Sequence, residues 1–364
     1  MIIRKATTLL TVICMIACLS SCALYDKEYV AVNDYVISSP DLSKNEGRIT
    51  TANLSELKRA VENAVEMGEK EVNIIFPENY SGDVSQDLAE ACWQVRSQNA
   101  LCAYCVDNIS YELSKIVNYY EATLSVSYAD TGVPFDKIYQ MQYATGISDL
   151  IKKTMESGEK KLVILIKNSS YTAESIASMV SDIYLKNPIS LPKEPSVNIQ
   201  LYGGTGNQKL YNMTFNYGMS DEKLILEKEE LSFINPFNDV YETDNEKFKA
   251  VAEYIRGNIA IGDDSTIYSA LVNGEGNSRA LALSTVALCN KIGLDSAVVE
   301  GQKNYNDRLW NLIKIDGSYY HFDPYDFLES DTDRIYLKSD SDMWNSYRWD
   351  TSSYPKCSLS LTID

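Results

Sequence analysis

The segment from Asn273 to Leu294 carries a nearly continuous run of apolar side chains behind a polar turn with two glycines. A helix on a protein surface keeps one polar face, whereas the apolar positions of this segment cover every side of a helical wheel. They are Ala280, Leu281, Ala282, Leu283, Val286, Ala287, Leu288, Cys289 and Ile292. The pattern predicts a helix that is buried on most of its circumference. Ser278 stands at its beginning, and we expect this serine to act as the N-cap.

Two earlier stretches repeat one hydrophobic pattern. Residues 54–76 and 147–166 each predict an amphipathic helix that ends at a glycine (Gly68 or Gly158), then Glu-Lys and a strand rich in β-branched residues. A second helix and alternating strands follow in each copy. We therefore expect two α-β-α-β-β units, at 49–130 and 140–218. Neither contains a phosphate-binding loop or a His/Cys/Asp cluster, so recognition or a structural role is expected of them.

The rest of the chain divides by composition. Residues 219–245 are rich in charge and predict a linker, and residues 246–364 predict a further domain that contains the buried helix. The cysteines give little information about function. Cys92 has no partner that the spacing suggests, and Cys102 and Cys105 lie in "LCAYCVDNISYEL", which predicts a strand with the two thiols on opposite faces. We expect them to be small buried hydrophobic residues, and we expect no metal and no cofactor.

The N-terminus has the pattern of a targeting segment. Basic residues Arg4 and Lys5 precede an apolar stretch that is too short to span a membrane, and Leu19-Ser20-Ser21-Cys22 follows. This resembles a bacterial lipobox. The resemblance implies a signal peptide at 1–21, lipidation of Cys22 and a spacer at 22–48, so we expect an extracytoplasmic protein that is attached to the membrane through its lipid anchor.

The length limits the number of domains, and the net charge limits the kind of partner. A chain of 364 residues with 45% hydrophobic residues can form two or three domains. The formal net charge of −18 argues against nucleic acid as a partner, because nucleic acid binds basic surfaces.

Five stretches in the last third of the chain occur in a set order. They are "VAEYIRGNI", "TIYSALVNGEGNSRALA", "GLDSAVVEG", "RLWNLIKIDGSYYHFDP" and "WDTSSYPKC", between Val251 and Cys357. Together they resemble the transglutaminase-like superfamily. The resemblance implies an α+β fold with a papain-like core, in which a buried central helix packs on an antiparallel sheet. Such a fold would explain the missing polar face of the predicted helix.

The resemblance also implies a Cys-His-Asp triad for acyl transfer or amide hydrolysis. The nucleophile position is occupied by Ser278, fifteen residues before Gly293, and the base position, two residues before Trp310, is occupied by Arg308. Only the third position, Asp323, keeps the family residue. Serine needs a base to take its proton, and arginine stays protonated and offers no acceptor. We therefore expect a degenerate triad in a pseudoenzyme.

An active alternative depends on His321, the only histidine of the chain, which lies two residues before Asp323. A Ser278/His321 pair would make the protein a divergent hydrolase or acyltransferase. In the binding alternative, Trp310, Asn311 and His321 would line a cleft for a cell-envelope peptide, glycan or protein. A third alternative is a structural spacer of the envelope. We also expect the Arg308 guanidinium to contact the Asp323 carboxylate, because a buried carboxylate needs a partner.

Overall fold

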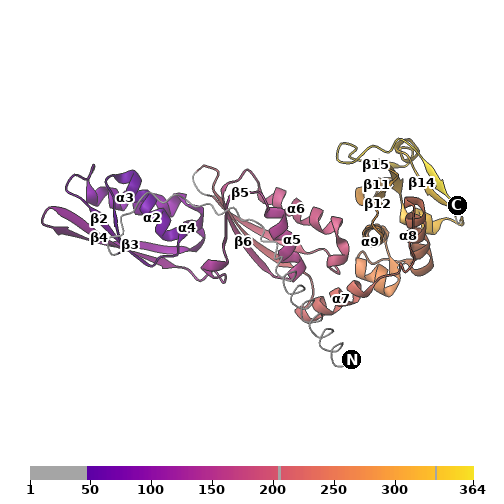
Figure 1. The fold of residues 1–364 in the computed structure, drawn as a ribbon, viewed down its shortest axis with the longest axis horizontal. Coiled ribbons are helices and arrows are strands. Elements are labelled where there is room, and N and C mark those ends of the chain that lie inside the picture. Colours follow the sequence, from indigo (N-terminus) through magenta and orange to yellow (C-terminus); the bar gives the residue numbers. More distant parts are fainter. Residues whose placement is uncertain (1–46, 204–205, 333) are drawn as a thin grey trace, which may run out of the picture.

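The computed structural model describes residues 47–203, 206–332 and 334–364. The predicted signal peptide, Cys22 and all but the last two residues of the predicted spacer lie outside these residues. Figure 1 shows an elongated molecule with three parts in a row: the first predicted repeat unit, the second unit and the C-terminal domain. In the part of the chain that is described, no helix is both long and apolar enough to cross a membrane.

The two repeat units share one topology. The first contains β1 (Arg48–Thr50), α2 (Leu54–Glu66), β2 (Glu71–Phe76), α3 (Val84–Gln98), α4 (Ala100–Cys105), β3 (Val106–Ile116) and β4 (Tyr119–Tyr128). The second contains η1 (Phe135–Lys137), β5 (Tyr139–Tyr143), α5 (Ile147–Ser157), β6 (Lys161–Asn168), α6 (Ala173–Lys186), η2 (Pro188–Ser190), β7 (Ser196–Gly203) and β8 (Lys209–Asn216). Their sheets have the orders β1-β2-β4-β3 and β5-β6-β8-β7, so corresponding strands occupy corresponding places.

Each unit begins with a short strand that the hydrophobic pattern did not reveal. β1 pairs in parallel with β2, and β5 pairs in parallel with β6, at the edge of each sheet. The first helix of the second unit, α5, ends where the sequence predicts. Gly158 follows it in a left-handed conformation (φ 75°) that glycine tolerates best.

The strand predicted at Cys102 and Cys105 is wrong, and the linker predicted at 219–245 contains a helix. The Cys102-x-x-Cys105 stretch is the helix α4, capped by the Asn99 side chain, which accepts from the backbone N–H groups of Leu101 and Cys102. The predicted linker contains α7 (Asp221–Phe233), because Ser220 caps a first turn that carries Asp221 and Glu222. Leu224 and Leu231 of α7 are buried in the core that the second unit shares with the C-terminal domain.

The C-terminal domain is built around α9 (Ser278–Ile292). It contains α8 (Asp244–Asn258), β9 (Ala260–Ile261), η3 (Ser269–Asn273), β10 (Glu275–Gly276), β11 (Ser296–Lys303), β12 (Asn306–Ile315), β13 (Ser318–Phe322), α10 (Pro324–Glu329), β14 (Ile335–Leu337), α11 (Asp340–Met343), β15 (Tyr347–Trp349) and β16 (Leu361–Ile363). Every residue of α9 from Ala280 to Cys289 is buried, and the helix lies against β11 and β12 of the antiparallel sheet β13-β12-β11-β15. The predicted α+β core with a buried central helix is confirmed.

Two large hydrophobic cores join the three parts. One core contains buried side chains of the second unit and of the C-terminal domain together, for example Tyr184 and Val286. The other contains the first unit and also Val163, Leu165 and Leu210 of the second unit's sheet. The second unit's sheet is therefore covered on both faces.

Candidate functional site

The N-terminus of α9 differs from the prediction by one residue. The N-cap is Asn277, whose side-chain oxygen accepts from the backbone N–H groups of Arg279 and Ala280 at 2.9 and 3.2 Å. Ser278, expected as the cap, is instead the first helical residue and is half-buried. Asparagine and serine are similarly good caps, so local preference could not decide between neighbours. Among the described residues the Ser278 hydroxyl has no hydrogen-bond partner, and therefore no base.

Arg308 lies between two carboxylates. Its Nε donates to Asp323 Oδ2 at 2.9 Å and its Nη2 donates to Asp326 Oδ1 at 2.6 Å. The expected contact with Asp323 is confirmed, although the planar fork bridges two acids instead of binding one in a bidentate manner. Tyr347 completes the group, because its hydroxyl contacts Asp323 Oδ2 at 2.8 Å and Asp326 Oδ2 at 2.6 Å. We call Arg308, Asp323, Asp326 and Tyr347 the Arg308 cluster.

The Arg308 cluster is buried and nearly closed to solvent. The side chain of Asp323 is 1% exposed and that of Arg308 is 12% exposed. Burial raises the pKa of Asp323, and the neighbouring Asp326 raises it further, while Arg308 and Tyr347 act in the opposite direction. For Asp326, burial is outweighed by hydrogen bonds from Lys303 and Tyr347, and its pKa is lowered. Asp323 also caps α10 through the N–H groups of Tyr325 and Asp326, which gives the aspartate a structural task.

This geometry leaves the base position without a base. A guanidinium has five donors and no acceptor, and the two carboxylates further raise the pKa of Arg308 despite its burial. Arg308 therefore cannot remove a proton from any nucleophile. Its role in the structure is to neutralise two acids at the beginning of α10.

The only histidine of the chain belongs to a separate chain of hydrogen bonds. The indole N–H of Trp310 donates to His321 Nδ1 at 2.9 Å, and His321 Nε2 lies 2.9 Å from Asp340 Oδ1. Because indole is only a donor, Nδ1 must be the unprotonated nitrogen and Nε2 must carry the proton. Asp340 Oδ2 in turn accepts from the backbone N–H of Cys357 at 3.2 Å. We call Trp310, His321, Asp340 and Cys357 the His321 chain.

Three residues of the His321 chain are of types that bind metal ions. The possible ligand atoms of His321, Asp340 and Cys357 lie within 4.8 Å of one another. A neutral histidine that binds a metal through one ring nitrogen carries its proton on the other. Here Nδ1 accepts the Trp310 N–H, so coordination through Nε2 would require a fully deprotonated ring. Burial raises the pKa of the Cys357 thiol to about 12, which also disfavours thiolate coordination. These residues do not fit a metal.

The predicted cleft residues do not line a cleft. Trp310, Asn311 and His321 are each 0% exposed. Asn311 points to the central helix, where its Nδ2 donates to the Ala282 carbonyl at 3.0 Å, and Trp310 packs edge-on against Tyr347 with ring centroids 5.1 Å apart. The sequence motif around these positions therefore forms core contacts between the sheet and the helix. Since His321 is buried and both ring nitrogens are engaged, it offers no base to Ser278.

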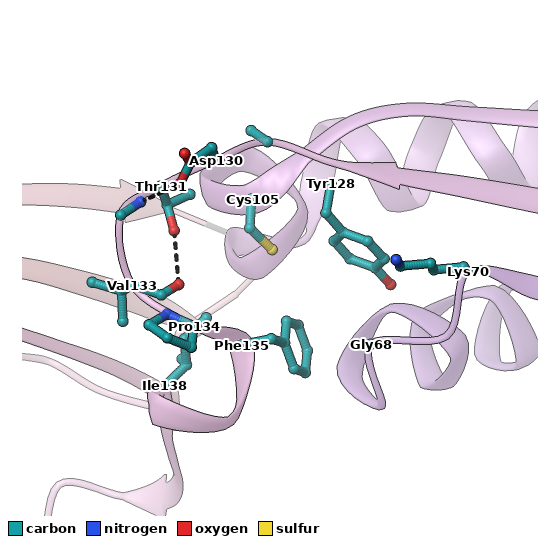
Figure 2. Close-up of a pocket in the computed structure, with 12 residues that line it drawn as sticks. Gly68, Lys70, Cys105, Tyr128, Asp130, Thr131, Val133, Pro134, Phe135 and Ile138 are labelled. Carbon is teal, nitrogen blue, oxygen red and sulfur yellow. Dashed lines mark hydrogen bonds between the residues drawn. The ribbon is translucent and has the colours of Figure 1, made fainter.

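Two pockets lie elsewhere on the described chain. One, of about 460 Å³, lies where the first unit meets the segment 129–138 (Figure 2). It is mostly apolar, with Tyr128 and Phe135 in edge contact at 5.8 Å, and burial raises the pKa of its Cys105 thiol to about 12. The thiol is therefore not a nucleophile at neutral pH.

The other pocket, of about 410 Å³, lies between the second unit and the C-terminal domain. Its lining includes Tyr184, Lys193 and Glu194 from the second unit and Thr266 and Arg279 from the C-terminal domain. Arg279 follows Ser278 directly in the sequence, but Ser278 itself does not line this pocket. No local sequence pattern predicts this pocket, because its two walls, residues 184–196 and 265–279, lie far apart in the sequence.

Comparison with known proteins gives matches to solved structures alone. No family model matches the sequence, and neither does any curated protein. A proposed cysteine protease from Cytophaga hutchinsonii is similar at 11% identity and a TM-score of 0.24, over 48% of this chain and 77% of that one. A transglutaminase is similar at 8% identity and a TM-score of 0.23, over 59% and 67% of the two chains. A proposed protease from Parabacteroides distasonis is similar at 12% identity and a TM-score of 0.21, over 69% and 39%.

The C-terminal domain has a mixed α+β fold in which one helix is buried against an antiparallel sheet. Its own elements define it: α9 is buried on the sheet of β11, β12 and β13, with Ser278 at the start of the helix, Arg308 on β12 and Asp323 directly after β13. The protease and transglutaminase activities named above are those of the similar proteins.

Proposed function

We propose that this chain is a lipid-anchored, extracytoplasmic binding protein whose transglutaminase-like domain holds a cell-envelope peptide, glycan or protein without catalysing acyl transfer. The observation that carries this proposal is the Arg308 cluster. The residue at the base position, which would have to accept a proton, is Arg308. Its guanidinium donates hydrogen bonds of 2.9 and 2.6 Å to two carboxylates. A hydrolase that uses Ser278 with His321 would lack a free base, because Trp310 and Asp340 engage both ring nitrogens.

Activity assays test the catalytic half of the proposal. The purified full-length chain is expected to release no more ammonia from glutamine-containing peptides, and to attach no more amine to them, than the Ser278→Ala variant does. The matched control is Ser55→Ala, a hydroxyl change at an exposed position of α2 in the first unit. Turnover that disappears in Ser278→Ala and persists in Ser55→Ala would overturn the proposal and favour the enzyme alternative.

Localisation and binding test the other half. Cys22→Ala is expected to release the protein from the membrane fraction or to block its processing, while Cys92→Ala leaves it in the membrane. The full-length chain is expected to retain components of its own cell-envelope fraction in a pull-down. A chain that stays in the membrane without Cys22 would contradict the lipid anchor, and a chain that retains nothing would favour the spacer alternative.

A further inference from the structure

The strand β3 is the longest edge strand of the two repeat units, and its outer side is open. It has 11 residues, whereas β1, β5 and β7 at the other edges have three, five and eight. The sheet order ends at β3, and none of the residues of this strand is buried. An open edge carries a row of unpaired N–H and C=O groups that can pair with another strand. Proteins usually shorten such edges or interrupt them with proline, and β3 is neither short nor contains a proline.

The hydrogen bonds of the neighbouring strand β4 show which backbone groups of β3 are free. The N–H of Val126 in β4 donates to the carbonyl of Lys70, on the side of β2. Because backbone groups alternate in direction along a strand, the neighbours of Val126 point to β3. One of them, Ser125, pairs with Ser110, so the even-numbered residues of β3 from 108 to 114 use their N–H and C=O groups toward β4. The N–H and C=O groups of the odd-numbered residues from 109, with Tyr111 among them, therefore point away from the sheet.

The sequence of β3 is complementary to itself when a second molecule runs in the opposite direction. If Tyr111 lies opposite the Tyr111 of a second molecule, Ile109 lies opposite Leu113 and Asp107 lies opposite Lys115. These are an aromatic, an apolar and an oppositely charged pair, three kinds that stabilise antiparallel strands. From 109 to 113 the paired residues are those whose backbone groups point outward. The register therefore forms about six hydrogen bonds between the two molecules, two at each pair of facing residues.

The apolar pairs lie on the face of the sheet that the helices cover. Ile109 and Leu113 are half-buried beside the core of the first unit, and Tyr111 between them is 37% exposed. Pairing would cover the exposed parts of these side chains, so burial of apolar surface adds to the hydrogen bonds.

The charged pair selects one register. Among the described residues Asp107 has no ion pair, and the ammonium of Lys115 has none either and lies over the Tyr120 ring, 5.5 Å from its centroid. A shift by two residues would keep the backbone hydrogen bonds but would place both charges opposite uncharged residues. Glu112 lies on the other face of the sheet, opposite Ser110 of the second molecule, and is exposed, so the repulsion between the two Glu112 carboxylates is weak.

We infer that β3 is the contact surface for a second molecule of this chain, which pairs with it in the antiparallel direction about Tyr111 and joins the two first units into one continuous sheet. The inference goes beyond the proposed binding function and does not depend on what the C-terminal domain binds. A single pair of strands buries less surface than a stable dimer interface, so we expect a weak association with a dissociation constant on the order of 100 µM. The lipid anchor proposed at Cys22 would hold the molecules on one membrane and raise their local concentration.

Exchange of the two charges tests both the surface and its register. The full-length chain is sedimented at increasing concentration and is expected to form dimers. Asp107→Lys and Lys115→Asp each bring like charges together at both ends of the paired strands, and each is expected to weaken the dimer about ten-fold. An equimolar mixture of these two variants is expected to associate as the unchanged chain does, because every charge then faces an opposite one. The variant that carries both changes is expected to recover for the same reason.

Matched controls separate the strand from general effects of charge. Asp136→Lys and Lys137→Asp make the same charge changes at exposed residues outside β3 and are expected to leave the dimer unchanged. Tyr111→Pro removes an N–H that points to the open edge, so it is expected to abolish the dimer while the melting temperature shows that the chain still folds.

Three results would each overturn the inference. One is a chain that stays monomeric at every concentration, which would leave the edge to a strand of another protein. Another is a dimer that Asp107→Lys and Lys115→Asp do not weaken. The third is a mixture of these two variants that associates no better than either variant alone. None of these results bears on what the C-terminal domain binds, so the proposed function is tested separately.

Discussion

The Arg308 cluster and the His321 chain lie side by side on one sheet, and they solve the burial of polar groups in opposite ways. The cluster buries one cation and two anions, and it needs Arg308, Tyr347 and Lys303 to satisfy the two carboxylates. The His321 chain buries a neutral imidazole ring, and one donor, Trp310, and one acceptor, Asp340, satisfy both of its nitrogens. The buried charged groups thus require several hydrogen bonds, and loss of one partner leaves a buried charge unpaired. The neutral histidine needs only two hydrogen bonds, and because both of its ring nitrogens are used, it cannot act as a base.

The largest effect is expected for Arg308→Ala. It leaves Asp323, whose side chain is 1% exposed, without its cationic partner, and loss of one member of a buried pair costs about 3–5 kcal/mol. The free energy of unfolding would be measured by urea denaturation. Arg308→Lys keeps the charge but cannot span both carboxylates, so an intermediate loss is expected. Asp323→Asn combined with Arg308→Leu should lose less than the two single changes together. Full additivity would show that the two residues do not act as a pair.

A smaller effect is expected for Tyr347→Phe. The change removes a hydroxyl that serves Asp323 at 2.8 Å and Asp326 at 2.6 Å, and a hydrogen bond to a charged group contributes about 1.5–3 kcal/mol. Tyr305→Phe, at a phenol that is 92% exposed, serves as the control and should be neutral. If Tyr347→Phe were equally neutral, the cluster would not depend on its hydroxyl.

The His321 chain predicts a pH dependence of modest size. Burial lowers the pKa of His321, although Asp340 acts to raise it. The unfolded chain therefore takes up this proton at a higher pH than the folded chain does. The stability contribution is complete above about pH 6.5, the ordinary pKa of histidine, and it decreases as the pH falls through the lowered folded pKa. Melting curves of the full chain between pH 7.5 and pH 5 should show this decrease, and His321→Gln should lack this component. An identical pH profile in both proteins would contradict the assignment.

The smallest effect, none at all, is expected from zinc. Because Trp310 donates to Nδ1, the His321 chain cannot offer a neutral ring nitrogen to a metal while keeping a proton on the other. Zinc should shift the melting temperature of the full chain no more than it shifts that of His321→Gln. If zinc stabilised the protein and His321→Gln abolished this effect, the hydrogen bonds of the His321 chain would have to rearrange to form a metal site.

Sequence patterns predicted the elements whose signals are periodic and long. The all-apolar helix α9 and the glycine-terminated helix of the second unit both appear; α9 starts at Ser278, one residue earlier than a Ser278 cap implies, and α5 ends before Gly158 as expected. Short elements were missed. The six-residue helix α4 is too short for periodicity, and its Asn99 cap was the only local signal.

The site was harder to predict than the fold. The contact between Arg308 and Asp323 followed from the aligned motif, because the two triad positions face each other in the family. Asp326 contacts Arg308 from 18 residues away in sequence, and Tyr347 contacts Asp323 from 24 residues away, and no motif marks either contact. Trp310, Asn311 and His321 were expected in a cleft because polar and aromatic residues near a triad usually are. Their burial depends on tertiary neighbours such as Ala282 and Asp340, which one sequence does not reveal.

The second unit's sheet has consequences for any attempt to shorten the chain. Val163 and Leu165 face the first unit's core, while Leu162 and Ile164 face the core shared with the C-terminal domain. In the first unit, the corresponding strand β2 alternates between buried and half-buried residues. A fragment that begins at β5 would present Val163, Leu165 and Leu210 as a bare apolar sheet face, and such faces promote aggregation. Insoluble fragments are therefore the expected outcome of trimming at this boundary, so the three parts must be produced together.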